Sequence, residues 1–487
     1  SPSQPRSEYR DIGMKRRQYF AALGAVSGTV LAGCSGDSDD GSTTNGTTDD
    51  NETQNSPPND ENVSQQNVTE SDLETIAQDF LEALVAESFD EAYEYASPAF
   101  EQNVPQDELA QQWESNITPL GEFNQFTSID YQGEEQEFDV VGAQAAFADG
   151  RAEFSVQSDG QVIEGFVFNG DTWTPPAYVD QSVFSEQELT LATSGDCELG
   201  ATVTIPDTNE PVPGVVLVHG SGDQGRDQQV GPNRTFKEIA WGLATRGVAV
   251  LRYDQRPVAC EIDRTEATVD DLVTDDAVTA LERLREYDRI EETFVAGHSL
   301  GGRLAPRIAA KDDELDGVIM LAPLAEPISD AIVRQTEYQL EQNPNLTDEQ
   351  RQAQLAQVEA LAERIRTLDI GDDELINLGG GERGKPFFRT LQEYDHVETA
   401  ASLDIPRFIL QGERDYLVTV DDDLAIWEEE LAGDPEVQIK RYETLNHRFQ
   451  PGEGMGKPSE WSEPNPVAKQ VVVDLTTFIT NQSQNLS

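Results

Sequence analysis

The spacing of apolar residues divides this chain into four stretches. An apolar run from Ala21 to Gly33 is followed by residues 35–70, which are almost free of apolar side chains. From Asp72, apolar residues recur at helical spacing and then alternate as in half-buried strands. From about Ser185, continuous apolar runs alternate with helical patterns. We therefore expect a small and a large folded domain behind a polar segment.

The first folded stretch, residues 72–180, combines helical patterns with alternating strands. Helices are predicted over 73–84, 92–95 and 106–113, and strands over 121–131, 137–147, 150–157 and 161–169. Asp149-Gly150 and Asp159-Gly160 are typical of tight turns between strands. Helices followed by an antiparallel sheet predict a small α+β domain. Four strand aromatics are expected in its core rather than on a ligand platform: Phe138, Phe147, Phe154 and Phe168.

The second folded stretch, residues 186–487, has the pattern of a doubly wound, mostly parallel α/β sheet. Two alternating runs, 189–193 and 198–205, form an antiparallel lead-in. Apolar strands are predicted at 214–219, 248–252, 293–297, 317–321, 407–410 and 437–442. Helices are predicted at 236–245, 271–287, 302–310, 421–431 and 467–480. Continuous apolar strands of this kind need helices on both faces of the sheet.

An insertion at about 325–388 interrupts this alternation and carries helical patterns over 331–342 and 348–368. Its place after a core strand predicts a lid, which would exclude water and shape selectivity. Its many charged residues are expected to form a solvated face. Gly379-Gly380-Gly381 could act as a hinge or as a simple turn.

The strongest chemical motif is Gly297-His298-Ser299-Leu300-Gly301, which follows a predicted strand and precedes a predicted helix. This context is the one that a nucleophile elbow requires, because the two glycines permit a tight turn that exposes the serine hydroxyl. The helix N-terminus behind the serine can stabilise developing negative charge. Ser299 is therefore the candidate nucleophile.

A second glycine-rich turn, His219-Gly220-Ser221-Gly222, ends the first core strand. It is either a simple tight turn or the second donor of an oxyanion hole, in which case the backbone amides of Ser221 and Leu300 are the candidates. We expect His219 to be structural.

The acid and the base should follow the serine in chain order. Asp415 lies on the loop beyond the strand that ends at Leu410, where a carboxylate can hold a histidine in one tautomer. Asp421, Asp422 and Asp423 are competing acids, but they are expected to cap the next helix.

The general base is found by elimination among four histidines. His219 and His298 belong to the two glycine motifs, and His396 precedes the acid. The remaining histidine, His447, follows the last core strand and is the candidate base.

Several segments resemble α/β-hydrolase esterases of the dienelactone-hydrolase-like or acyl-peptidase-like type. They read VLVHGSG, VAVLRYDQR, AGHSLGGRLAPRIA, LQGERDYLV and LNHRFQPGEG, within residues 188–480. The resemblance implies Ser299, Asp415 and His447 as a triad and carboxylesterase chemistry on small acyl esters. The sequence departs from the family at Pro257–Cys260, where Gly-Val-Gly is usual, and at His396, where proline is usual.

The segment DFLEALVAESFDEAYEYASPAF resembles a small domain of unknown function that is often found before bacterial and archaeal hydrolases. This resemblance implies a nuclear-transport-factor-2-like or cystatin-like fold for residues 72–180. The function and the protein partner of that domain stay open.

Charge narrows the setting in which the protein works. The chain has 33 Lys and Arg against 93 Asp and Glu, a net charge of −60, so nucleic acid and anionic surfaces are excluded as partners. Its hydrophobic content of 37% is enough for a folded core. A carboxylate-rich surface of this kind is typical of a halophile, because concentrated salt screens the repulsion.

Residues 1–33 are interpreted as a twin-arginine lipoprotein signal that starts at Met14. Arg16-Arg17 precede an apolar run too short to span a bilayer, and Cys34 follows as the lipidation site. An uncleaved anchor helix is the alternative. Residues 34–71 are expected to be an acidic tether, with Asn-x-Ser/Thr sequons that arise by chance or carry glycans. The protein would thus be exported and anchored on the outer face of the membrane.

Two cysteines remain, Cys197 and Cys260, and export would allow them to form a disulfide. The sequence does not decide whether they meet. Neither has metal-ligand spacing, and the chemistry expected here needs no metal or organic cofactor.

The sequence favours a serine hydrolase that acts on small acyl esters. A serine peptidase of the same fold is the first alternative, and a thioesterase is disfavoured for an exported protein. A non-catalytic surface binding protein is the alternative from another class, but an intact triad argues against it.

Overall fold

The computed structural model describes residues 69–135, 138–148, 150–171, 173–195 and 197–486. The predicted signal at 1–33, Cys34 and residues 35–68 of the predicted tether lie outside the described residues. No helix in the described part of the chain is both long enough and apolar enough to cross a membrane.

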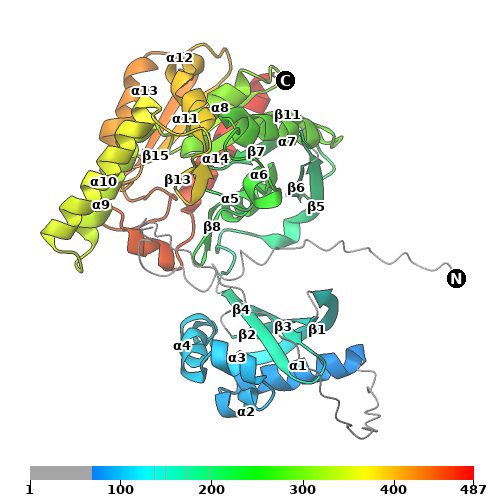
Figure 1. The fold of residues 1–487 in the computed structure, drawn as a ribbon. Helices are drawn as coiled ribbons and strands as arrows, with labels where there is room; N and C mark the ends of the chain where they lie inside the picture. The colour runs from blue at the N-terminus through cyan, green and yellow to red at the C-terminus, as the bar shows by residue number, and fades with distance from the viewer. Residues whose placement is uncertain (1–68, 136–137, 149, 172, 196, 487) are drawn as a thin grey trace, which may run out of the picture. The chain divides into compact units, whose positions relative to one another are not determined.

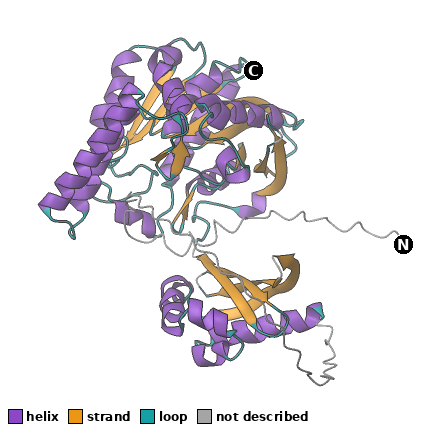
Figure 2. Cartoon of the chain, in the orientation of Figure 1, coloured by secondary structure: helices purple, strands orange, loops and turns teal. Residues whose placement is uncertain are grey.

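The small domain contains helices followed by a four-stranded antiparallel sheet in the order β1-β2-β3-β4 (Figure 2). The helices are α1 (Glu70–Val85), α2 (Phe89–Tyr93), α3 (Pro98–Asn103) and α4 (Gln106–Asn116). The strands are β1 (Phe123–Glu135), β2 (Phe138–Phe147), β3 (Arg151–Ser158) and β4 (Ile163–Asp171). The predicted α+β class is confirmed.

Two helix starts in this domain show how local sequence sets its boundaries. Thr69 caps α1, and its side chain and that of Asp72 form a reciprocal capping box. Helix α3 was not predicted, although Ser97 and Pro98 are typical of a helix start. Ser97 accepts a hydrogen bond from the Phe100 amide at 3.0 Å, and Pro98 takes the first helical position.

Of the four strand aromatics expected in the core of the small domain, two are buried and two are only half-buried. Phe147 and Phe154 are buried in a core that also contains Trp113, which stacks on Phe154 with ring centroids 6.0 Å apart. Phe138 and Phe168 are half-buried. The stacking is thus part of the packing between the helices and one face of the sheet.

The large domain is built on an eight-stranded sheet in the order β16-β15-β12-β11-β7-β10-β6-β5 (Figure 1). The lead-in strands are β5 (Phe184–Ala192) and β6 (Glu198–Pro206), and the others are β7 (Val212–Val218), β10 (Ala249–Tyr253), β11 (Ile290–His298), β12 (Gly317–Leu321), β15 (Arg407–Gly412) and β16 (Val437–Tyr442). β6 pairs antiparallel with β5 and β10, while the remaining neighbours are parallel. The predicted mostly parallel sheet is confirmed.

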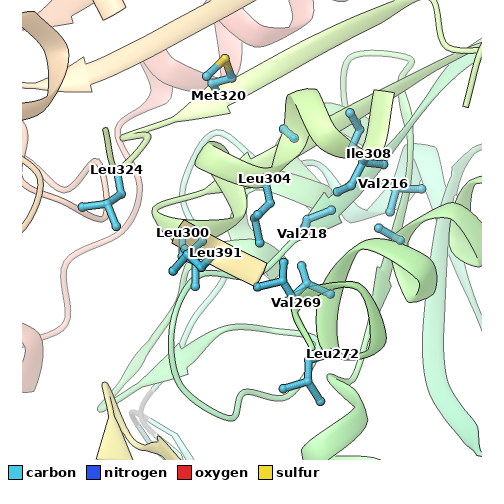
Figure 3. Packing of buried hydrophobic residues seen from close by; sticks show 14 of the residues in the cluster. Val216, Val218, Val269, Leu272, Leu300, Leu304, Ile308, Met320, Leu324 and Leu391 are labelled. Atoms are coloured by element: carbon cyan, nitrogen blue, oxygen red, sulfur yellow. The ribbon is translucent and has the colours of Figure 1, made fainter. Parts of the chain in front are cut away.

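Helices cover both faces of this sheet. Each core strand therefore contributes side chains to two hydrophobic cores. In β7, Val216 and Val218 belong to the cluster under α7 and α8, whereas Val215 and Leu217 belong to the cluster under α5 and α14. The helices are α5 (Thr235–Ala244), α7 (Asp275–Arg285), α8 (Leu300–Ala309), α13 (Ala425–Glu430) and α14 (Lys469–Leu486). Figure 3 shows side chains of α8 packed near Val216 and Val218. This double burial explains why the strand sequences are continuously apolar.

The insertion predicted as a lid contains two long helices, a hairpin and a shorter helix. They are α9 (Ile328–Gln342), α10 (Asp348–Thr367), β13 (Ile376–Leu378), β14 (Gly381–Arg383) and α11 (Lys385–Glu393). α9 and α10 run side by side at one edge of the domain (Figure 1). Gly379 and Gly380 form the turn of the hairpin with φ of 61° and 92°, which glycine adopts readily. The glycines therefore serve as a turn.

The segment after β10 contains both Cys260 of the possible disulfide and the residues that depart from the family. Cys197 and Cys260 form a disulfide across a sequence separation of 63. The residues that depart from the family, Pro257–Cys260, fold into the short helix α6 (Arg256–Ala259) and the bonded cysteine. The disulfide ties this segment to the beginning of β6.

Candidate active site

Ser299 occupies a sharp turn between β11 and α8. Its backbone has φ 59° and ψ −118°, a region that residues with a side chain rarely adopt. A Cβ on Gly297 would come within 2.0 Å of the Gly301 oxygen, and one on Gly301 within 2.4 Å of the His219 oxygen. Both glycines are therefore required by close backbone approach, as a nucleophile elbow demands.

Asp415 and His447 are joined in the structure by a hydrogen bond. His447 Nδ1 lies 2.7 Å from Asp415 Oδ2, and the two residues are 6% and 2% exposed. The other carboxylate oxygen, Oδ1, accepts the amides of Leu417 and Val418 at 2.8 and 2.9 Å. The loop after β15 thus fixes the carboxylate, and the carboxylate fixes the imidazole.

Ser299 and His447 line the same cavity, which has a volume of about 480 Å³. Gly220, Ser221 and His298 line it as well. Asp415 is absent from the lining among the described residues, which fits a group that acts only through the histidine. The structure therefore brings together the three residues that the sequence selected.

The two proposed oxyanion donors flank Ser299. A Cβ on Gly220 would lie 2.9 Å from the Ser299 Cβ, so the turn that carries Ser221 lies against the nucleophile. Leu300 begins α8, where the amide has no acceptor within the helix. In the described part of the chain, no backbone hydrogen bond uses the Ser221 amide. Both amides are therefore candidate donors to an oxyanion.

Two further histidines, one in each glycine motif, are buried around the site. His219 Nε2 lies 3.0 Å from the Gly225 oxygen, and burial lowers the pKa of His219 to about 4. His298 Nε2 lies 2.9 Å from the His447 oxygen, and its Nδ1 lies 3.0 Å from Gln228 Nε2. Burial holds the pKa of His298 well below its usual range, and the His447 ring lowers it further. We infer that a neutral His298 links Gln228 to the base.

The competing acids Asp421–Asp423 lie in the first turn before α13, as expected, but the cap is Thr419, whose hydroxyl accepts the Asp422 amide at 3.0 Å. Asp423 is buried and accepts the amides of Ala325 and Glu326 at 2.8 and 3.1 Å. It therefore anchors the base of the insertion and takes no part in a triad.

His396 lies apart from the cavity lining, on α12 (His396–Ala401). Its ring meets Trp427 edge-on with centroids 5.1 Å apart. Burial, followed by the nearby Arg303, lowers the pKa of His396 to about 3. This histidine is a packing residue.

The insertion forms much of the cavity wall. It contributes Ile328, Ile332, Gln335 and Gln339 from α9, and Leu378, Gly379 and Gly380 from the β13–β14 hairpin. Other polar or aromatic lining residues come from distant segments: Asp223, Gln224, Gln228, Gln229, Arg448 and Trp461. This second set was not predicted, because residues so far apart in the chain show no shared pattern.

Residues 209–453 match the family described as serine aminopeptidase, S33. Residues 77–166 match a family of unknown function, DUF3887. The chain is 32% identical over 404 residues to esterase EstD of Thermotoga maritima, across 82% of this chain and 93% of that protein.

Solved structures with similar folds include Est1E from Butyrivibrio proteoclasticus with bound ferulic acid. It is 17% identical, with 61% of this chain and 99% of that chain covered and a TM-score of 0.41. Brefeldin A esterase, described as a bacterial homologue of human hormone sensitive lipase, is 17% identical, with coverage of 64% and 80% and a TM-score of 0.39. The assignment of this chain rests instead on the family match, the identity to the curated relative and the order of the sheet. The chain belongs to the serine aminopeptidase S33 family of α/β-hydrolase enzymes.

Proposed function

We propose that this protein is a serine hydrolase that cleaves carboxylic esters through an acyl-enzyme intermediate. The observation that carries the proposal is the hydrogen-bonded Asp415–His447 pair, whose imidazole shares a cavity with Ser299 on its elbow. The relative named an esterase, EstD of Thermotoga maritima, supports an ester as the substrate.

The first half of the reaction forms the acyl-enzyme. Ser299 Oγ attacks the ester carbonyl while the imidazole of His447 takes the hydroxyl proton. The Ser221 and Leu300 amides hold the negative oxygen of the tetrahedral intermediate, and loss of one such donor typically costs about 2.7–4 kcal/mol. The intermediate collapses, the alcohol leaves with the proton from His447, and the acyl group stays on Ser299.

The second half returns the enzyme to its starting state. His447 takes a proton from water as the water attacks the acyl carbonyl, and the proton then returns to Ser299 Oγ as the carboxylic acid leaves. Asp415 keeps Nδ1 protonated throughout, so that Nε2 is the nitrogen that exchanges protons. The net reaction consumes one water and yields one acid and one alcohol.

An aminopeptidase activity is the second candidate, because the family is described by that activity. An aminopeptidase needs a carboxylate to bind the substrate's ammonium group. Among the described cavity-lining residues, Asp223 is the carboxylate, and it already pairs with Arg264 at 2.5 Å and Arg383 at 2.8 Å. This pairing favours the esterase.

The test is turnover of p-nitrophenyl acetate and butyrate by the full chain in molar KCl. Ser299→Ala should abolish turnover, whereas Ser402→Ala, at an exposed serine after α12, should leave it intact. Equal turnover by wild type and Ser299→Ala, both folded by circular dichroism, would refute the proposal. Amino-acid p-nitroanilides in the same assay test the peptidase alternative.

The proposal extends to location: an exported protein held on the outer face of the membrane by a lipid on Cys34. The supporting observations are the twin arginine and the small residues before Cys34. Expressed in a haloarchaeal host, Cys34→Ser should move the protein from the membrane to the medium. Retention of that variant in the membrane would favour the uncleaved anchor helix instead.

A further inference from the structure

Arg448 is a buried cation in the wall of the catalytic cavity. It follows the base His447 directly, it lines the cavity, and it is 7% exposed. Burial lowers its pKa to about 10, which still leaves the guanidinium charged at neutral pH. A fixed positive charge therefore lies beside the catalytic residues.

The neighbours of Arg448 hold it in place but do not neutralise it. Nη1 donates to the Gln228 oxygen and to Thr235 Oγ1, both at 3.1 Å, and the guanidinium lies over Trp461 at 5.6 Å. Nε has no hydrogen-bond partner, and no carboxylate of the described residues forms an ion pair with Arg448. Glu238, the acid whose charge raises the pKa of Arg448, already accepts hydrogen bonds from three other donors.

A buried charge without a partner is costly, and the cost falls when an opposite charge arrives. A guanidinium matches a carboxylate well, because its N–H groups can donate two parallel hydrogen bonds. Asp223, the carboxylate among the described lining residues, is shared between Arg264 and Arg383. It therefore does not pair with Arg448, whose positive charge is left without an ion-pair partner among the described residues.

The position of Arg448 connects it to the reacting groups. Gln228 accepts from Arg448 through its backbone oxygen and contacts His298 through its side chain, and His298 contacts the His447 oxygen. A substrate group held by Arg448 would thus be fixed in register with the nucleophile and the base.

We propose that Arg448 determines specificity by pairing with a carboxylate carried by the ester substrate. This inference rests on the proposed esterase function and narrows it to esters with a free acid group. The acid group belongs either to the acyl part or to the alcohol part, and the experiment includes one substrate of each kind.

Arg303 supplies a matched control. It is also buried without an ion pair among the described residues, and burial also lowers its pKa to about 10. Its Nη1 donates to the oxygens of Ala325 and Glu326, and it is not part of the cavity lining. Arg303→Leu therefore removes a comparable buried charge away from the substrate.

The experiment compares kcat/KM for matched acidic and neutral esters, with the full chain at one fixed KCl concentration. Monoethyl glutarate is paired with ethyl pentanoate, and acetoxyacetate with propyl acetate. Wild type should prefer the acidic member of one pair, and Arg448→Leu should lower that preference about 30-fold or more, as loss of one partner of a buried charge pair does. Arg448→Lys should retain part of the preference, and Arg303→Leu all of it.

A second experiment measures the binding of a dicarboxylate directly, so that the anion site is tested even if no acidic ester is turned over. Glutarate should quench the fluorescence of Ser299→Ala through Trp461, and Trp461→Phe in that background should remove the response. Glutarate should also inhibit hydrolysis of p-nitrophenyl acetate by the wild type. This measurement does not depend on the folding of an Arg448 variant. Binding of glutarate without any Ser299-dependent turnover would refute the esterase function and leave the anion site standing. An equal acidic-to-neutral ratio in wild type and Arg448→Leu, with no inhibition by glutarate, would overturn the inference.

Discussion

At the scale of single residues, chain order and local motif were enough to select Ser299, Asp415 and His447 as candidates, and the structure places Ser299 on a sharp turn and the other two in a hydrogen-bonded pair. The strand–turn–helix context predicted the elbow, and elimination selected His447 as the candidate base. Gln228, Arg448 and Trp461 could not be found in this way, because their roles come from contacts between segments up to 220 residues apart. In the sequence alone, Arg448 is recognisable only as an arginine that follows His447.

The Asp415–His447 hydrogen bond leads to a prediction about catalysis. Asp415→Asn keeps the shape of the side chain but favours the wrong tautomer of the imidazole, so kcat should fall by about 10³–10⁴. Ester turnover measures this, with the exposed Asp421→Asn as the control. A loss of less than tenfold would show that Asp415 does not orient the base.

His396 leads to a prediction about stability and pH. Its folded pKa of about 3 lies below that of an unfolded histidine, about 6.5, so only the unfolded state binds the proton between these values. The free energy of unfolding should therefore fall as the pH drops from 6.5 towards 3. His396→Leu should flatten this dependence, measured by urea unfolding in molar KCl. An unchanged slope would contradict the lowered pKa.

At the scale of elements, the core strands could be predicted because burial on two faces makes them continuously apolar. The long helices could be predicted because apolar residues recur on one face at helical spacing. The short pieces could not. The strands β13 and β14 and the helices α11 and α12 have three to nine residues each, fewer than the about 11–18 residues over which periodicity is read, and their apolar side chains pack into the core of the domain. The last strand, β16, was predicted together with the buried apolar strands. It lies at the edge of the sheet, where its residues are half-buried or exposed except for Tyr442.

The disulfide leads to a prediction at this scale. By closing a loop of 63 residues it restricts the unfolded chain, and it ties α6 to the beginning of β6. Replacing both Cys197 and Cys260 by serine should lower the free energy of unfolding by about 2–4 kcal/mol. Dithiothreitol should lower the melting temperature of wild type and leave the double variant unchanged. If reductant had no effect on wild type, with thiol titration showing full reduction, the stabilising role would be wrong.

At the scale of the whole molecule, charge is the dominant property. The net charge of −60 repels itself at low ionic strength, and salt shortens the screening length from about 10 Å at 0.1 M to about 3 Å at 1 M. The melting temperature should therefore rise steeply between 0.1 and 2 M KCl. Sucrose is the control, because it favours compact states without screening. A melting temperature that responds to sucrose but not to KCl would contradict the halophilic interpretation.

If Ser299 is the nucleophile, it should become acylated during turnover and react with reagents for activated serines. Mass spectrometry of the intact chain after treatment with an organophosphate tests this. We expect one adduct per chain, located on the peptide that contains Ser299, absent in Ser299→Ala and slowed in Asp415→Asn. An adduct on another residue, or none in a folded wild-type chain, would contradict it.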